Sequence, residues 1–156
     1  MSEETEGTFV VTHAEADSAV LKDVDAGQVH TLGENPGVEV GDVLDATLAP
    51  EPPLEVTWQV VAVETRRSIT VETSGEPPTQ QERDIAAAQS VGELTREERA
   101  GKGEIHVLTV PDEQTDDAVA DVLDDEATLA RAARMPEVNR VEVRAETGVV
   151  SVRYLP

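Results

Sequence analysis

The chain has 156 residues, with 33 Asp and Glu against 12 Lys and Arg, and a formal net charge of −21 at pH 7. It has no cysteine, which excludes disulfides and thiol chemistry. No stretch approaches the ~18 apolar residues that a membrane-spanning helix needs, so we expect no membrane partner.

The negative charge is spread along the whole chain, whereas an acidic tail would concentrate it in one block. In molar salt the Debye length falls to roughly 3 Å, which screens most of the self-repulsion of such a surface. We therefore expect a soluble, cytoplasmic protein adapted to concentrated salt, with an intrinsically disordered acidic chain as the alternative. The start of the chain, MSEETEGT, has no basic segment and no apolar run, so we expect no signal peptide.

The first half is typical of short strands separated by Gly and Pro turns. Residues 1–6 are expected to be disordered. The predicted strands are Thr8–His13, Asp17–Asp23, Gln28–Leu32, Val43–Leu48, Leu54–Glu64 and Ser68–Glu72. This series without a helix favours a small antiparallel β-barrel over residues 7–73. Alternation within Leu54–Glu64 places Leu54, Val56 and Trp58 on one apolar face, so we expect this face to point to the core and interpret Trp58 as a core residue.

A helical linker is predicted over residues 74–101. Thr79-Gln80-Gln81-Glu82 has the form of a capping box and predicts a helix from Gln80 to Val91. Thr95-Arg96-Glu97-Glu98 repeats the pattern, and Gly101 and Gly103 would end this second helix.

Residues 102–156 predict a compact β-α-α-β-β unit. Glu104–Val110 has apolar residues on both faces, as a central strand does. Two helices should follow, from Pro111 to Leu123 and from Asp124 or Asp125 to Met135-Pro136. Val138–Arg144 and Val149–Tyr154 flank a turn and predict a hairpin. The chain as a whole is therefore expected to belong to the α+β class.

Several runs along the chain carry a resemblance to known proteins. They are TFVVTHAEADSAVLKDV, PEPPLEVTW, PPTQQERD, GELTREERAGKGE, DDEATLARAAR and VVSVRYLP. Over its whole length the chain resembles a family of uncharacterised haloarchaeal proteins, a domain of unknown function. That resemblance implies a haloarchaeal cytoplasm and supplies no activity. Residues 7–72, with VEVGDVLDATL before a long strand, also resemble OB-fold or TRAM-like modules, which often bind RNA; an SH3-like barrel remains open.

Two histidines are candidate metal ligands. His13 and His30 lie on predicted strands that would be neighbours in the barrel, and two imidazoles with a carboxylate are ordinary zinc or iron ligands. No short His-x-His or His-x₃-His spacing supports such a site. We therefore expect no cofactor, and we keep a metal-dependent protein or enzyme using this pair as the alternative.

Five arginines are candidate ligand-binding residues: Arg66, Arg67, Arg140, Arg144 and Arg153. Strand alternation places Arg140 and Arg144 on one face, which Arg153 joins if the hairpin register allows. The competing interpretation is that Arg140, Arg144 and Arg153 form ion pairs with Glu142, Glu146 and Glu137.

The sequence contains no recognisable catalytic motif. With 33 acidic residues, some carboxylates always lie close together, so a pair of nearby carboxylates does not indicate acid/base catalysis. The leading hypothesis is a non-enzymatic binding or adaptor protein whose barrel binds RNA or another protein. We expect no DNA binding, because the basic footprint is thin and molar salt weakens phosphate contacts. A further hypothesis is self-association through the edge of the C-terminal sheet.

Overall fold

A computed structural model describes residues 3–99 and 101–156 of the chain. The described residues form a mixed α+β structure with ten strands in two sheets and three α-helices, which confirms the predicted class. The chain divides into two units, residues 1–69 with Leu129–Arg134, and Thr70–Thr128 with Met135–Pro156. Both units are therefore discontinuous in the sequence.

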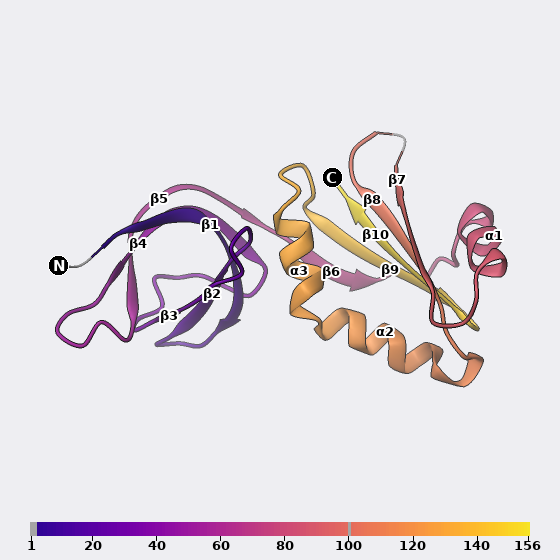
Figure 1. The fold of residues 1–156 in the computed structure, drawn as a ribbon, viewed down its shortest axis with the longest axis horizontal. Helices are drawn as coiled ribbons and strands as arrows, with labels where there is room; N and C mark the ends of the chain where they lie inside the picture. Colours follow the sequence, from indigo (N-terminus) through magenta and orange to yellow (C-terminus); the bar gives the residue numbers. More distant parts are fainter. Residues whose placement is uncertain (1–2, 100) are drawn as a thin grey trace. The chain divides into compact units, whose positions relative to one another are not determined.

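The first unit contains five strands that pair around a closed barrel (Figure 1). They are β1 (Thr5–Ala14), β2 (Ala19–Asp23), β3 (Val29–Leu32), β4 (Asp42–Pro50) and β5 (Trp58–Ser68). Their order is β1-β2-β3-β5-β4, and β4 returns to pair with β1. All neighbours are antiparallel except β3 and β5, which meet in parallel at Leu32 and Trp58.

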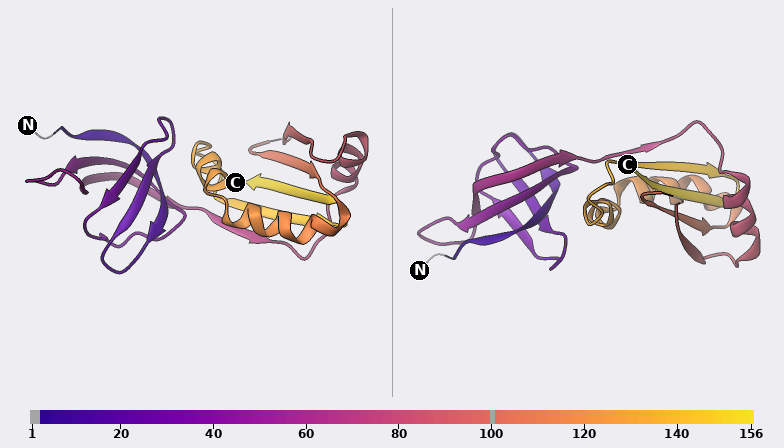
Figure 2. Two further views of the ribbon diagram at one scale, coloured as in Figure 1. Left: turned by 60° about the horizontal axis from the view of Figure 1, so that its bottom comes forward. Right: turned by 90° about the horizontal axis from the view of Figure 1, so that it is seen from above.

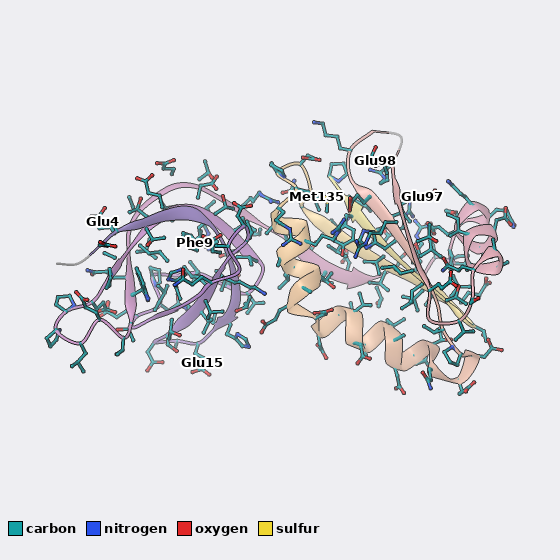
Figure 3. The ribbon with its side chains drawn as sticks, in the orientation of Figure 1. Glu4, Phe9, Glu15, Glu97, Glu98 and Met135 are labelled. Carbon is teal, nitrogen blue, oxygen red and sulfur yellow. The ribbon has the colours of Figure 1, made fainter. Side chains whose placement is uncertain are left out.

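The barrel interior is filled by apolar residues from alternating strand positions and by Val38 from the β3–β4 connection. The buried set comprises Phe9, Val11, Ala19, Leu21, Leu32, Val38, Leu44, Ala46 and Leu48. Figure 3 shows Phe9, the only phenylalanine of the chain, within the barrel. Ala14, Trp58 and Val60 pack against this core while remaining partly exposed, so Trp58 lies at the margin of the core and is not enclosed by it.

The second unit is a five-stranded sheet in the order β6-β9-β10-β8-β7. Its strands are β6 (Thr70–Thr73), β7 (Leu94–Glu98), β8 (Glu104–Thr109), β9 (Arg140–Glu146) and β10 (Val149–Leu155). Its helices are α1 (Gln80–Ala88), the 3₁₀ turn η1 (Asp112–Gln114) and α2 (Thr115–Asp124), while α3 (Glu126–Ala133) crosses the boundary between the units. Figures 1 and 2 show α2 lying along this sheet.

The predicted capping box begins α1. The Thr79 hydroxyl accepts a hydrogen bond from the Glu82 amide at 3.2 Å, and a Glu82 carboxylate oxygen accepts from the Thr79 amide at 3.0 Å. Two amide groups that a helix N-terminus leaves unpaired are satisfied in this way. Glu82 is buried, so the cap also fixes a carboxylate beneath the helix.

The structure differs from the sequence expectations at four places. Thr95–Glu98 is part of strand β7, because each of its residues pairs with β8 and this ladder outweighs a four-residue capping pattern. Thr70–Thr73 leaves the barrel and pairs in parallel with β9. Residues 51–57 form a loop, so Leu54 and Val56 are exposed and do not face the core. Strand β1 begins at Thr5, inside the segment expected to be disordered.

Candidate functional site

The loop between β4 and β5 is the most exposed apolar segment of the barrel. Leu54 is 78% exposed and Val56 is 72% exposed. The Glu51 amide donates to the Thr57 carbonyl at 2.8 Å, and the Glu55 amide donates to the Glu51 carbonyl at 2.9 Å. These bonds close the base of the loop, so its apolar side chains are presented to solvent by a defined backbone.

A pocket of about 220 Å³ lies beside this loop. Trp58 provides its aromatic surface and two carboxylates contribute to its rim; the full lining is Glu34, Pro36, Glu51, Trp58, Gln59 and Val60. The Gly33 amide donates to the Trp58 carbonyl at 3.2 Å, which ties the β3–β4 loop to the start of β5. The pocket is too small for a drug-sized ligand. Its size suits a single side chain.

His30 lies behind Trp58, inside the barrel. It pairs with the core residue Leu21 across β2 and β3, and its ring also meets the Phe9 ring at a centroid distance of 5.5 Å. Within the described residues neither of its ring nitrogens has a hydrogen-bond partner. Burial lowers the pKa of His30, and the charge of Asp23 opposes this effect only in part. The side chain is therefore held neutral near pH 7.

The two candidate metal ligands are not brought together. His13 is exposed at the end of β1, where its Nδ1 lies 3.1 Å from the Thr12 hydroxyl, whereas His30 is enclosed by the barrel core. Across residues 3–99 and 101–156 the structure contains no group of three or more His, Cys, Asp or Glu side chains suited to a metal ion.

Arg66 and Arg67 lie on β5 and interact with other parts of the first unit. Arg66 forms an ion pair of 2.6 Å with the buried carboxylate of Asp42 and donates to the Gly37 carbonyl at 3.0 Å. Arg67 donates to the Ala133 carbonyl at 2.9 Å, in the helical segment that belongs to the same unit. Both guanidinium groups thus have internal hydrogen-bond acceptors.

The other three candidate arginines surround one carboxylate on the C-terminal sheet. Glu142 accepts from Arg144 at 2.6 Å and from Arg153 at 3.3 Å, and it lies 4.0 Å from Arg140. The three arginines lie on the same face of the sheet as Glu142, because the β9–β10 register sets Arg153 opposite Glu142. Of the glutamates expected to pair with these arginines, Glu142 does so, whereas Glu146 pairs with Arg83 at 3.4 Å. The structure adds Glu76 at 2.9 Å from Arg144 and Glu82 at 3.8 Å from Arg153.

The Glu142 cluster, defined by Glu142 and its three arginines, is an electrostatic centre of the second unit. Burial by itself raises the pKa of Glu142, but the hydrogen bond from Arg144 and the charges of the three arginines outweigh burial. The pKa of Glu142 therefore lies below its usual value, and the carboxylate stays ionised at neutral pH. Arg144 and Arg153 are mostly buried, so they offer little surface to a ligand.

The exposed loop was missed by sequence reasoning. Leu54 and Val56 alternate in step with Trp58, which is the signature of a strand. Pro52 and Pro53 were the available signal, because proline cannot donate to a sheet ladder and so predicts that pairing stops there.

Comparison with known proteins gives one match. A model described as a family of unknown function (DUF5812) matches residues 5–145, as the resemblance to an uncharacterised family led us to expect. No curated protein and no solved structure matches the chain. No helix of the described residues has the length and apolar character needed to cross a membrane.

Proposed function

Because the chain belongs to a family of unknown function (DUF5812), we propose its role from the barrel itself: it is a non-enzymatic binding module that docks a polypeptide segment on the β4–β5 loop. The observation that carries the proposal is the pair of exposed side chains Leu54 and Val56 beside the Trp58 pocket. Large exposed apolar side chains gathered at one place mark interaction sites on soluble proteins.

The strand order of the barrel supports this location. The order β1-β2-β3-β5-β4 with a parallel β3–β5 contact matches the strand order of OB-folds and supports an OB-like assignment of the barrel. OB-folds bind ligands on the β2–β3 face and on the loops that follow β1 and β4. The apolar side chains of this barrel lie on the second of those loops.

The charges favour a polypeptide over RNA. Glu34 and Glu51 line the pocket and Glu55 lies between the two exposed apolar residues, so the phosphates of RNA would be repelled. Trp58 is the only aromatic residue of the pocket, whereas single-strand binding relies on several stacking surfaces. A segment with one or two apolar side chains flanked by Lys or Arg fits both features. Salt-rich cytoplasm, implied by the haloarchaeal resemblance, is the proposed setting.

A displayed library of random peptides, panned against the whole protein in about 2 M KCl, tests the proposal at an ionic strength that screens unspecific attraction. We expect enriched peptides to carry apolar residues next to a Lys or Arg in direct contact with Glu34 or Glu51, because longer-range attraction is screened at this ionic strength. Because Trp58 is the only tryptophan, its fluorescence reports binding of a synthetic enriched peptide without a label. Poly(U) RNA is titrated in parallel, and binding of RNA in place of peptide would overturn the polypeptide assignment.

Matched variants locate the surface. Leu54→Asp and Val56→Asp should abolish the fluorescence change, while Val63→Asp, at a residue that is 49% exposed on β5, should leave it intact. Enriched peptides that bind Leu54→Asp as tightly as the unaltered protein would show that the β4–β5 loop is not the binding surface. An unenriched library would count against a polypeptide ligand altogether.

A further inference from the structure

The second unit ends at a strand with an open side. Strand β7 stands last in the sheet order and pairs only with β8 among the described strands. The ladder from Leu94 opposite Leu108 to Glu98 opposite Glu104 is regular, with no bulge. Figure 3 shows Glu97 and Glu98 on this strand.

The register identifies which backbone groups are unused. The Thr109 amide donates to the Glu93 carbonyl and the Arg99 amide donates to the Gly103 carbonyl, at 3.2 Å in both cases. In an antiparallel ladder hydrogen-bonded residues recur at every second position, so the inner bonds continue at Thr95 and Glu97. The N–H and C=O groups of Leu94, Arg96 and Glu98 therefore point away from β8, toward the open side.

This open edge has only part of the usual protection against pairing. Strand β7 contains no proline, lysine or bulge, but it is five residues long and three of these, Arg96, Glu97 and Glu98, are charged, so a partner strand must match its charges. Val91 and Leu94 are exposed at its start, by 61% and 44%. Arg96 and Glu98 are exposed and alternate in charge along the edge.

We propose that β7 pairs antiparallel with β7 of a second copy of this chain about a two-fold axis. The outward groups of the even-numbered residues must face each other, which allows Arg96 opposite Leu94, Arg96 or Glu98 of the partner subunit. The register with Glu98 forms two ion pairs, whereas the register with Leu94 forms none and the register with Arg96 places like charges together, so charge selects the register with Glu98. The same register brings the two Glu97 side chains opposite each other, and this repulsion offsets part of the attraction of the two ion pairs. The two sheets then form one continuous sheet.

Sedimentation equilibrium of the full chain measures the association in about 2 M KCl. At this salt concentration we expect the chain to be folded and the repulsion between its carboxylates to be screened. The expected result is a molar mass that rises to twice that of the monomer as concentration increases, because a single edge contact lies at the small end of protein interfaces. A mass that stays monomeric up to millimolar concentration would overturn the proposal.

Charge exchange tests the register. Arg96→Glu and Glu98→Arg each replace two attractive cross-strand pairs by repulsive ones, so each should raise the dimer dissociation constant about tenfold. The double variant R96E/E98R should restore it. Arg83→Glu, the same change on α1, serves as the control and should have no effect. A double variant as weak as either single variant would exclude this register.

Proline at the outward position separates edge pairing from folding. Arg96→Pro removes an amide that the inner ladder does not use, and proline is tolerated at such edge positions. The variant should keep its circular dichroism spectrum and sediment as a monomer. If it folds and still forms the dimer, the contact lies elsewhere on the molecule.

Discussion

The imidazole of His30 meets the indole of Trp58 edge-on, with ring centroids 4.6 Å apart and ring planes at 90°. The contact joins a buried polar ring of the barrel core to the aromatic wall of the surface pocket. A change in the charge of His30 should therefore alter its packing against Trp58 at the proposed binding surface.

The lowered pKa of His30 predicts loss of barrel stability in mild acid. The unfolded chain binds a proton at an ordinary histidine pKa of about 6.5, whereas the folded chain resists it, so stability is present above that pH and falls below it. One such group contributes a slope of at most about 1.4 kcal/mol per pH unit. Urea unfolding at several pH values between about 5.5 and 7.5 spans this histidine window and measures the slope.

His30→Leu should flatten that slope, because the variant has no group to protonate at this position. His13→Leu, at an exposed histidine, is the control and should preserve the slope. A slope unchanged in His30→Leu would assign the acid sensitivity to other groups.

Removal of the shared carboxylate should destabilise the second unit. Glu142→Gln keeps the shape of the side chain but leaves Arg144 and Arg153 mostly buried without their common anion. Breaking buried ion pairs of this kind costs about 3 kcal/mol, whereas Glu146→Gln, which loses one exposed pair with Arg83 at 3.4 Å, should cost less than about 1 kcal/mol. Denaturant unfolding of both variants provides the comparison, and equal losses would show that the shared carboxylate contributes no more to stability than one exposed ion pair.

Gly41 is expected to be intolerant of alanine. Its φ is 93°, and an added Cβ would lie 2.5 Å from the Ile69 carbonyl oxygen, which is backbone and has little freedom to move. Gly27 has a φ of 74° but open space around it, so Gly27→Ala measures the backbone strain alone, about 1 kcal/mol. In thermal unfolding, the free energy of unfolding of Gly41→Ala should be lower than that of Gly27→Ala by at least about 2 kcal/mol. Similar values for the two variants would mean that the barrel adjusts freely at Ile69.

The net charge of −21 predicts that the folded state requires salt. Removal of salt lengthens the Debye screening distance from about 3 Å at 1 M to about 30 Å at 0.01 M, so carboxylates repel one another across the molecule. Circular dichroism during dialysis from multimolar to millimolar KCl should report a cooperative loss of strand and helix signal. A spectrum that does not change with KCl concentration would show that folding does not depend on screening of the negative charge.

The sequence predicted local structure well where a pattern was long or chemically specific. The Thr79–Glu82 cap, the strand at Glu104–Thr109 and the C-terminal hairpin all occur as expected. The same capping pattern at Thr95 predicted a helix and was wrong, since the partner strand that holds this segment extended is not visible in its own residues. Thr70–Thr73 was assigned to the wrong sheet for the same reason, because its partner β9 lies some seventy residues later in the chain.

The candidate site was harder to predict than the fold. Arginines were selected for their charge, but the sequence cannot show that Arg144 and Arg153 share one carboxylate with Arg140, which depends on the β9–β10 register and on burial. Leu54 and Val56 were placed in the core by alternation alone. Exposure of an apolar side chain is decided by where the strand ends, and strand ends are the least certain part of a sequence-based assignment.

The interleaving of the two units along the chain constrains how the protein is synthesised and how it can be cut. The first unit includes Leu129–Arg134 and the second includes Met135–Pro156, so a ribosome must release most of the polypeptide before either unit has all its parts. A fragment that ends at Ile69 would carry every strand of the barrel and still lack a helical segment of its unit. Expression of the barrel alone therefore requires a redesigned connection that supplies this segment, and a simple truncation does not provide it.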